Sequence, residues 1–190
     1  GYVGVIGEQE GIDLLLESAK YITEKRNDIQ FAILGGGTSL DAMKALCTKL
    51  NLNNYIDFYG RVSDETLMEV LNTTDVCVNP DKPSEMNNLS TMNKIMEYMA
   101  LKKPIVQYDL KEGRISAQKA SLYAENNNTK DFAEKILYLI DNPNIREKMA
   151  EYGYHRIINE LSWEHENKNL VNVYNNLLYK SKITSLQVNT

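Results

Sequence analysis

The chain of 190 residues is long enough for one domain with a buried core, and its 43% hydrophobic and 25% charged residues are typical of a globular protein. Its formal net charge is −5 without any block of lysine or arginine, which argues against a nucleic-acid-binding surface. No apolar run approaches the roughly 20 residues of a membrane span, and no signal peptide is visible.

Short apolar, β-branched runs predict strands, and segments with apolar residues every three or four positions predict helices. The strands are expected at 2–6, 29–34, 55–60, 75–80, 103–108 and 121–124. The helices are expected at 11–26, 39–52, 63–74, 129–142, 144–161 and 163–180, together with one that begins near residue 89 and runs into the strand at 103–108. The segment 81–88, "DKPSEMNN", is expected to be a loop.

Polar residues mark where some of these helices begin. Ser63 is the expected N-cap of one helix, and Ser39 or Thr38 that of another, because their hydroxyls can accept a first-turn N–H. Strands that are nearly all apolar and alternate with helices predict an α/β fold with a doubly wound, Rossmann-like parallel sheet and helices on both faces. We expect one domain over 1–182 and a flexible tail over 183–190. Since the chain opens directly on a strand without methionine, we expect it to be a piece of a longer chain.

The cysteines and histidines show no metal-binding spacing. Cys47 and Cys77 lie 30 residues apart and are interpreted as buried free thiols rather than a disulfide, which favours a reducing compartment. His155 and His165 fall on the late helices, where surface or packing roles are expected.

Three consecutive glycines, residues 35–37, follow the second strand, at the edge of a parallel sheet where ligands bind. They do not form GxGxxG, because Leu40 occupies the position of the last glycine, and an NAD site is therefore disfavoured. Two interpretations remain open, namely a close approach to a ligand and a tight turn that needs a positive φ angle.

The polar start of the helix after residue 89 is a candidate anion site. Ser90 or Thr91 can cap this helix and leave free N–H groups around Thr91, Met92 and Asn93, where the helix dipole favours an anion. Lys94 lies in the same turn. Glu97 shares a face with Asn93 and Lys94 and can bind a hydroxyl. The alternative is a solvated Lys94–Glu97 pair on an amphipathic helix.

Four segments carry a resemblance to a known family: "FAILGGG", "YIDFYGRVSDETLMEVLNTTDVCVNP", "MEYMALKKPIV" and "LSWEHENKNLVNVY". In order and spacing, over residues 2–178, the chain resembles the C-terminal, nucleotide-sugar-binding domain of a retaining GT-B glycosyltransferase of the group-1 (family 4) type. The resemblance implies that Glu97 binds the ribose hydroxyls of a nucleotide diphosphate sugar such as a UDP-sugar. It also implies further donor-binding residues, which are Thr91, Met92 and Asn93 for the diphosphate, Gly60, Arg61 and Val62 near the base, Gly35 and Gly37 in the cleft, and Ser90 beside the diphosphate residues.

The chain also departs from the family pattern. Leu89 stands where many members have a first glutamate, and Val5 and Glu10 stand where members have an arginine and a lysine that grip the diphosphate. Other cations must then balance the diphosphate charge. The candidates are Lys94, Arg61 and Arg114, of which Lys94 and Arg61 are expected to stabilise the leaving group.

The resemblance implies a transferase that moves a sugar onto an acceptor with retention when this half is joined to an N-terminal GT-B domain. The chain alone is expected to be inactive. No cofactor, metal or nucleic acid is expected. A role in polysaccharide biosynthesis is expected, in the cytoplasm at the inner face of the membrane, with peripheral membrane association through the other half. The alternatives are a nucleotide-binding module without transfer activity and half of a sugar-nucleotide epimerase, for which the sequence offers no base.

Overall fold

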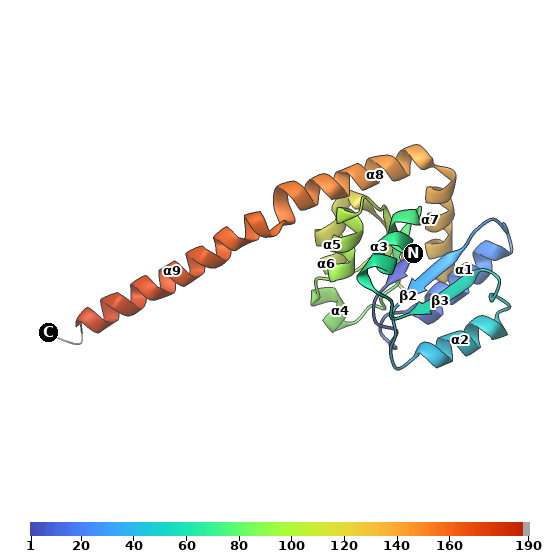
Figure 1. The fold of residues 1–190 in the computed structure, drawn as a ribbon, viewed down its shortest axis with the longest axis horizontal. Coiled ribbons are helices and arrows are strands. Elements are labelled where there is room, and N and C mark those ends of the chain that lie inside the picture. Colours follow the sequence, from blue (N-terminus) through green and yellow to red (C-terminus); the bar gives the residue numbers. More distant parts are fainter. Residues whose placement is uncertain (188–190) are drawn as a thin grey trace. The chain divides into compact units, whose positions relative to one another are not determined.

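A computed structural model of the chain describes the backbone of residues 1–187 and the side chains of residues 1–178. The chain divides into two compact units, Gly1–Tyr154 and the residues from His155 onward, and each is described by itself. The first unit holds all the strands of the described residues, and the second is helical (Figure 1).

The first unit contains two three-stranded parallel sheets. The strands are β1 (Tyr2–Val3), β2 (Phe31–Leu34) and β3 (Ile56–Gly60) in one sheet, and β4 (Cys77–Asn79), β5 (Ile105–Tyr108) and β6 (Ser121–Ala124) in the other. The sheets meet at Gly1, whose amino group donates to Val76 O at 2.8 Å and whose carbonyl accepts from Val78 N at 2.9 Å. The strand order across both is therefore β3-β2-β1-β4-β5-β6, with the direction of the chain order reversing between β1 and β4.

Helices flank the sheets, which confirms the predicted α/β fold class. The helices of the first unit are α1 (Ile12–Thr23), α2 (Leu40–Lys49), α3 (Asp64–Thr73), α4 (Glu85–Leu89), α5 (Asn93–Ala100), α6 (Lys111–Ala117) and α7 (Thr129–Asp141), and α8 (Pro143–Arg156) begins there. Helix α1 packs against α7 and α2, whereas α5 packs against α6. A 3-10 turn, Gln118–Ala120, precedes β6.

The core explains why the predicted periodicities were correct in this unit. On α1, Ile12, Leu15, Leu16, Ala19 and Ile22 recur at helical spacing and are all buried. They contact a cluster that includes residues of β1, β2, β4, β5 and α7. Burial of apolar surface at about 25 cal/mol per Å² is the main contribution that holds these layers together. Both cysteines are buried and free, as predicted.

The first strand is shorter than the predicted 2–6. Pairing with β2 ends after Val3, because Gly4 takes a φ of 151° and the chain turns away from the ladder. Gly4 N still donates to Leu34 O at 3.0 Å, and Ile6 N donates to Gly36 O at 3.1 Å. The residues after Val3 therefore form a loop that stays bonded to the glycine turn.

The segment between β4 and β5 differs most from prediction. Part of the expected loop is α4, which Ser84 caps by accepting the N–H of Asn87 at 3.0 Å. The next helix, α5, starts at Asn93 rather than near 89. The prediction that Ser90 or Thr91 caps it was wrong, since Met92 is its N-cap and no side chain caps it. Ser90 Oγ instead donates to Met86 O at 2.7 Å, which completes α4.

The predicted caps elsewhere had mixed outcomes. Ser63 caps α3 and accepts the N–H of Thr66 at 3.3 Å, as predicted. Ser39 holds the N-cap position of α2, but its side chain makes no capping hydrogen bond. Helix α6 was not predicted.

In the second unit, a π-helical turn, Ile157–Leu161, precedes α9 (Trp163–Gln187). Helix α9 thus enters the range 183–190 that was expected to be a tail, of which residues 188–190 lie outside the described part of the chain. None of the helices in residues 1–187 combines the length and apolarity that a bilayer crossing requires.

Candidate functional site

The candidate site lies at the carboxyl edge, where β1 and β4 diverge. Tyr98 of α5 bridges the gap between the two strands, because its hydroxyl accepts the N–H of Val3 at 2.9 Å and donates to Val78 O at 3.4 Å. The ring is fully buried, and burial raises the pKa of Tyr98 well above its usual value, so the hydroxyl remains a neutral donor. The contact fixes α5 at the point where ligands bind in doubly wound sheets.

A hollow of about 470 Å³ opens beside the first turn of α5. Its lining comes from three places, the end of β1, the middle of α3 and the start of α5, and consists of Val3, Gly4, Leu67, Thr91, Met92, Asn93, Lys94 and Glu97. The structure thus brings together five of the predicted site residues. The sequence had indicated them from the polarity of one helix start.

The start of α5 offers unused hydrogen-bond donors to this hollow. Within residues 1–187, the backbone N–H groups of Thr91, Met92, Asn93 and Lys94 have no recorded acceptor, whereas Ile95 N donates to Met92 O at 3.0 Å. Because α5 has no side-chain cap, its dipole and these donors remain available to an anion. The carboxylate of Glu97 is exposed one turn further along and makes no recorded ion pair or hydrogen bond there.

Lys94 is not the solvated partner of Glu97 that one interpretation predicted. Its Nζ lies 2.9 Å from Oδ1 and 3.2 Å from Oδ2 of Asp81, with the two side chains 12% and 2% exposed. Burial raises the pKa of Asp81, and the charge of Lys94 opposes that rise. Asp81 was missed, because a carboxylate in a loop carries no sequence signal of burial.

The glycine turn, residues 35–37, packs closely against the backbone of the loop after β1. A Cβ on Gly35, whose φ is 129°, would lie 1.8 Å from Gly4 O, and one on Gly37 would lie 2.4 Å from Ile6 O. The tight turn that needs a positive φ is thus realised at Gly35. Neither glycine is among the residues that line the hollow, and their role in the cleft stays a prediction.

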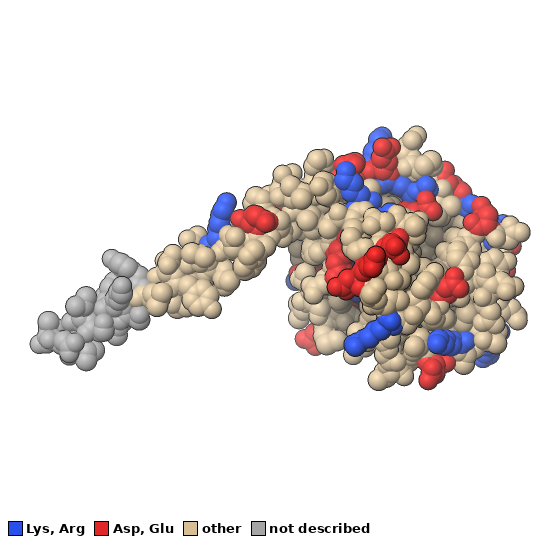
Figure 2. Space-filling view, viewed as in Figure 1, with Lys and Arg blue, Asp and Glu red and all other residues tan. Residues whose placement is uncertain are grey.

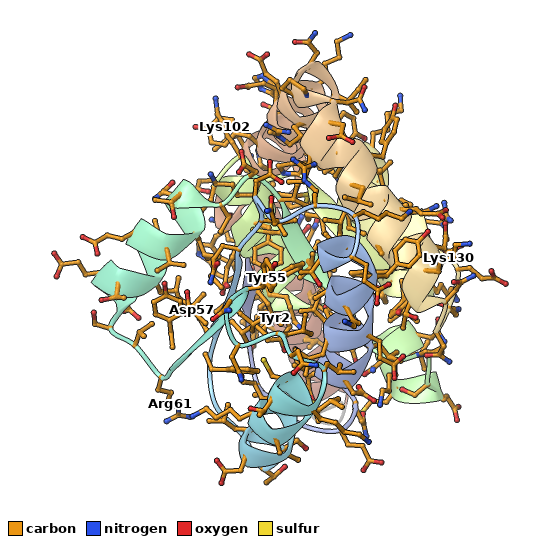
Figure 3. The ribbon with its side chains drawn as sticks, turned by 90° about the vertical axis from the view of Figure 1, so that its right-hand side faces the viewer. Tyr2, Tyr55, Asp57, Arg61, Lys102 and Lys130 are labelled. Atoms are coloured by element: carbon orange, nitrogen blue, oxygen red, sulfur yellow. The ribbon has the colours of Figure 1, made fainter. Side chains whose placement is uncertain are left out.

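The residues expected near the base lie at the end of β3 and directly after it. Gly60 has a φ of 68° and accepts the N–H of Gly35 at 2.8 Å. Arg61 is exposed on the loop that leads from β3 to α3, as Figure 3 shows, and Val62 is partly buried. Neither Gly60, Arg61 nor Val62 lines the hollow in the described structure, so their contact with a base also stays a prediction.

Arg114 is already engaged within the protein. Its Nε and Nη2 donate to the two carboxylate oxygens of Asp109 at 2.7 and 2.6 Å, and its guanidinium lies 4.3 Å from the ring centroid of Tyr123. The guanidinium holds the pKa of Asp109 below its usual value. Arg114 lies outside the hollow, so the geometry favours Lys94 over Arg114 as the cation for a diphosphate.

The charged side chains near the hollow lie on α3 and α5. Figure 2 shows acidic side chains grouped over α3, where the sequence places Asp64, Glu65 and Glu69. Because α3 contributes only Leu67 to the lining, the charged side chains that line the hollow are Lys94 and Glu97 of α5, and the N-terminal end of the α5 dipole adds partial positive charge. Within residues 1–187, no three histidine, cysteine, aspartate or glutamate side chains come together as a metal site requires.

The fold is a Rossmann-like, doubly wound α/β domain with a polar hollow at its carboxyl edge, and comparison with known families identifies its family. The chain belongs to the group 1 glycosyl transferases, since the family described as "Glycosyl transferases group 1" matches residues 1–156.

Two curated relatives illustrate the match. An alpha-D-kanosaminyltransferase of Streptomyces kanamyceticus is 26% identical over 79% of this chain and 38% of its own length. A poly(ribitol-phosphate) alpha-N-acetylglucosaminyltransferase of Staphylococcus aureus (strain COL) is 28% identical over 92% of this chain and 35% of its own. The chain thus spans less than half the length of these relatives.

Solved structures share the fold. A TarM variant of S. aureus, crystallised with UDP among its ligands, has a TM-score of 0.80 at 24% identity and covers 92% of this chain and 35% of its own. Anabaena Alr3699/HepE in complex with UDP has a TM-score of 0.81 at 14% identity and covers 93% of this chain and 48% of its own. The neighbours are larger proteins, of which this chain corresponds to one part.

Proposed function

We propose that this chain is the donor-binding half of a retaining glycosyltransferase that uses a nucleotide diphosphate sugar. The observation that carries the proposal is the hollow beside α5, which is lined by Thr91 to Lys94 and by Glu97, and among the described residues neither their backbone N–H groups nor the Glu97 carboxylate has a recorded partner. A phosphate group suits the donors and a pair of ribose hydroxyls suits the carboxylate. One ligand with both groups suits the whole hollow.

Each part has a chemical role in this proposal. The N–H groups of Thr91, Met92 and Asn93 bind the diphosphate, and Glu97 accepts hydrogen bonds from the ribose. As the glycosidic bond breaks, negative charge grows on the departing diphosphate, and preorganised N–H donors and the ammonium of Lys94 stabilise it. Arg61 remains a second candidate for that charge. The rest of catalysis is positioning of donor and acceptor, which requires no metal.

The proposed partner is an N-terminal GT-B domain of the same protein that holds the acceptor. The greater length of the relatives supports it. Exposed apolar side chains on α9 offer a contact surface, and they are Trp163, Leu170, Val171, Val173, Tyr174, Leu177 and Leu178. A cytoplasmic enzyme at the inner face of the membrane, active in polysaccharide synthesis, fits the proposal.

Calorimetric titration of the chain with UDP, GDP and their sugars tests the proposal. We expect saturable binding of at least one nucleotide diphosphate and a preference for UDP, the nucleotide present with the structural neighbours. A folded chain that binds none of these nucleotides would contradict the proposal.

A second candidate is a GT-B nucleotide-binding module without transfer activity. The substitutions Val5, Glu10 and Leu89 favour it, because Val5 and Leu89 expose apolar side chains, at 59% and 66%, where the family has charged groups. The two candidate functions, transferase and binding module, predict different turnover of a UDP-sugar. The full-length protein should release UDP from a UDP-sugar in the presence of acceptor if it is a transferase, and should bind the nucleotide without release if it is a module.

A further inference from the structure

Lys94 stands between two hollows. Besides the hollow of about 470 Å³ that Glu97 lines, a smaller one of about 220 Å³ adjoins the first turn of α5. Met92 and Lys94 line both. The smaller hollow is completed by Val5, Gln9, Glu10, Asp81, Met86, Asn87 and Ser90. In a nucleotide sugar the diphosphate joins the nucleoside to the sugar, so a wall between two adjoining hollows is a suitable place for its cation.

Asp81 determines where the ammonium lies. Both of its carboxylate oxygens accept from Nζ, and its side chain is 2% exposed at the end of β4. An ammonium has three donors, of which Asp81 takes two. Within residues 1–187 no acceptor is recorded for the third. Lys94 therefore has one donor left for a ligand in the wall between the hollows.

The neighbours of Lys94 restrict it further. Nζ lies 5.0 Å from the ring centroid of Tyr2, whose hydroxyl donates to Val5 O at 2.6 Å. A Cβ at Gly4 would come within 3.7 Å of Lys94 Cε and 2.9 Å of the Tyr2 hydroxyl. The side chain of Lys94 therefore lies beside Gly4 and the ring of Tyr2, at the end of β1.

We propose that Asp81 is a positioning residue that holds Lys94 Nζ in the wall between the two hollows, so that the ammonium contacts the second phosphate of the donor. This inference rests on the proposed function. A free lysine side chain loses rotamer entropy when it binds a ligand, whereas a lysine held by a buried carboxylate has already lost it. In this way the start of α5 supplies the cation that the β1–α1 loop, with Val5 and Glu10, does not supply.

The charge of Asp81 and its positioning role predict opposite changes in UDP affinity when Asp81 is replaced, so the direction of the change tests the inference. Removal of a carboxylate near a bound diphosphate should by itself strengthen binding of the anion. If Asp81→Asn weakens UDP binding, that loss reflects the position of Lys94 and not the charge of Asp81. The comparison of UDP with UMP isolates the second phosphate, because both ligands share the base, the ribose and the first phosphate.

The experiment titrates UDP and UMP into the wild-type chain, Lys94→Met, Asp81→Asn and the double variant. Lys94→Met is expected to weaken UDP about tenfold to a hundredfold, the scale of one charge-assisted hydrogen bond, and UMP much less. Asp81→Asn is expected to weaken UDP severalfold in the wild-type background and not at all in the Lys94→Met background. Lys82→Met is the matched control, because Lys82 forms a 2.7 Å ion pair with Asp13 and lines neither hollow.

Each outcome separates the inference from the proposed function. Absence of nucleotide binding by the wild-type chain rejects the proposed function. If the wild-type chain binds UDP, three results reject the positioning role alone. In the first, Asp81→Asn binds UDP as tightly as the wild type or more tightly. In the second, it loses the same affinity in the wild-type and Lys94→Met backgrounds, and in the third it loses the same affinity for UDP and for UMP. If Asp81→Asn does not fold, the ammonium NMR signal of Lys94 in the wild-type chain decides. It should shift when UDP is added and stay in place with UMP, and the same shift with both ligands overturns the inference.

Discussion

Two segments at the carboxyl edge of the sheets were both predicted from the sequence to contact a ligand, and they differ in the structure. Residues 35–37 follow β2 as a glycine turn, and residues 91–94 form the start of α5. In the glycine turn, backbone groups form hydrogen bonds within the protein, because Gly35 N donates to Gly60 O and Gly36 O accepts from Ile6 N. At the start of α5, four consecutive N–H groups have no recorded acceptor within residues 1–187.

The difference shows that an unusual sequence pattern at a loop does not tell whether its residues pack within the protein or bind a ligand. The glycines at 35 and 37 allow the backbone of this turn to pack closely against the backbone of Gly4 and Ile6, so they serve the structure of the fold. An uncapped helix with polar first-turn residues leaves donors for a ligand. Four experiments test this distinction between groups that the fold uses and groups that are left for a ligand.

The largest effect is expected at the glycine turn. Gly35→Ala should lower the free energy of unfolding by more than about 2 kcal/mol, because the new Cβ would collide with Gly4 O and the φ of 129° is unfavourable for alanine. Gly36→Ala is the matched control, since a Cβ there meets nothing within 4 Å. Urea denaturation measures both, and equal stabilities would show that the turn is not a packing feature.

Glu97 tests the other side of the comparison. Glu97→Ala should weaken UDP binding by about 1–3 kcal/mol, the range for a lost charge-assisted hydrogen bond, and should leave stability nearly unchanged because the side chain is exposed. Calorimetric titration measures the affinity. Glu69→Ala, which removes an exposed carboxylate from α3, is the control for net charge. Equal affinities for the two variants would remove Glu97 from the site.

Two serines sharpen the comparison at helix starts. Ser63→Ala should cost about 1 kcal/mol of stability, because the hydroxyl of Ser63 caps α3. Ser39→Ala should change stability by less than about 0.5 kcal/mol, since this hydroxyl caps nothing. Thermal unfolding of both variants provides the measurement, and a larger loss for Ser39→Ala would reverse the assignment of the two caps.

The smallest effect is expected at Arg114. Because its guanidinium already binds Asp109 and lies outside the hollow, Arg114→Ala should change UDP affinity by less than about 0.5 kcal/mol. Its stability should also change little, since both partners are about half exposed and such ion pairs contribute weakly. A tenfold loss of UDP affinity would restore Arg114 as a phosphate ligand.

The parts of the fold that were predictable are those with a repeated local pattern. Helix α1 followed from the spacing of Ile12, Leu15 and Leu16, and β6 was placed correctly at 121–124. Helix α4 was missed because "SEMNNLS" is short and polar, with no apolar periodicity to indicate a helix. The start of α5 was misplaced because Ser90 and Thr91 have the chemistry of caps, while the chain uses one to finish α4 and the other to contact Glu112.

The site shows the same division. Thr91, Met92, Asn93, Lys94 and Glu97 were recognisable because they lie within seven residues of one helix start, where dipole and side chains act locally. The partner of Lys94 was not recognisable. Asp81 is 13 residues away, and its burial depends on β1, β4 and α5 coming together at the divergence of the sheets.

By itself, then, the amino-acid sequence determined the alternating α/β pattern, the family and the helix that lines the hollow, because helix and strand formation and helix-end chemistry depend on neighbours along the chain. Only the tertiary structure decided which polar groups remain available. Arg114 pairs with Asp109 and Lys94 pairs with Asp81, whereas Glu97 and the N–H groups of Thr91 to Asn93 have no recorded partner in the described part of the chain. That outcome depends on burial and on partners from distant segments, which local sequence does not specify.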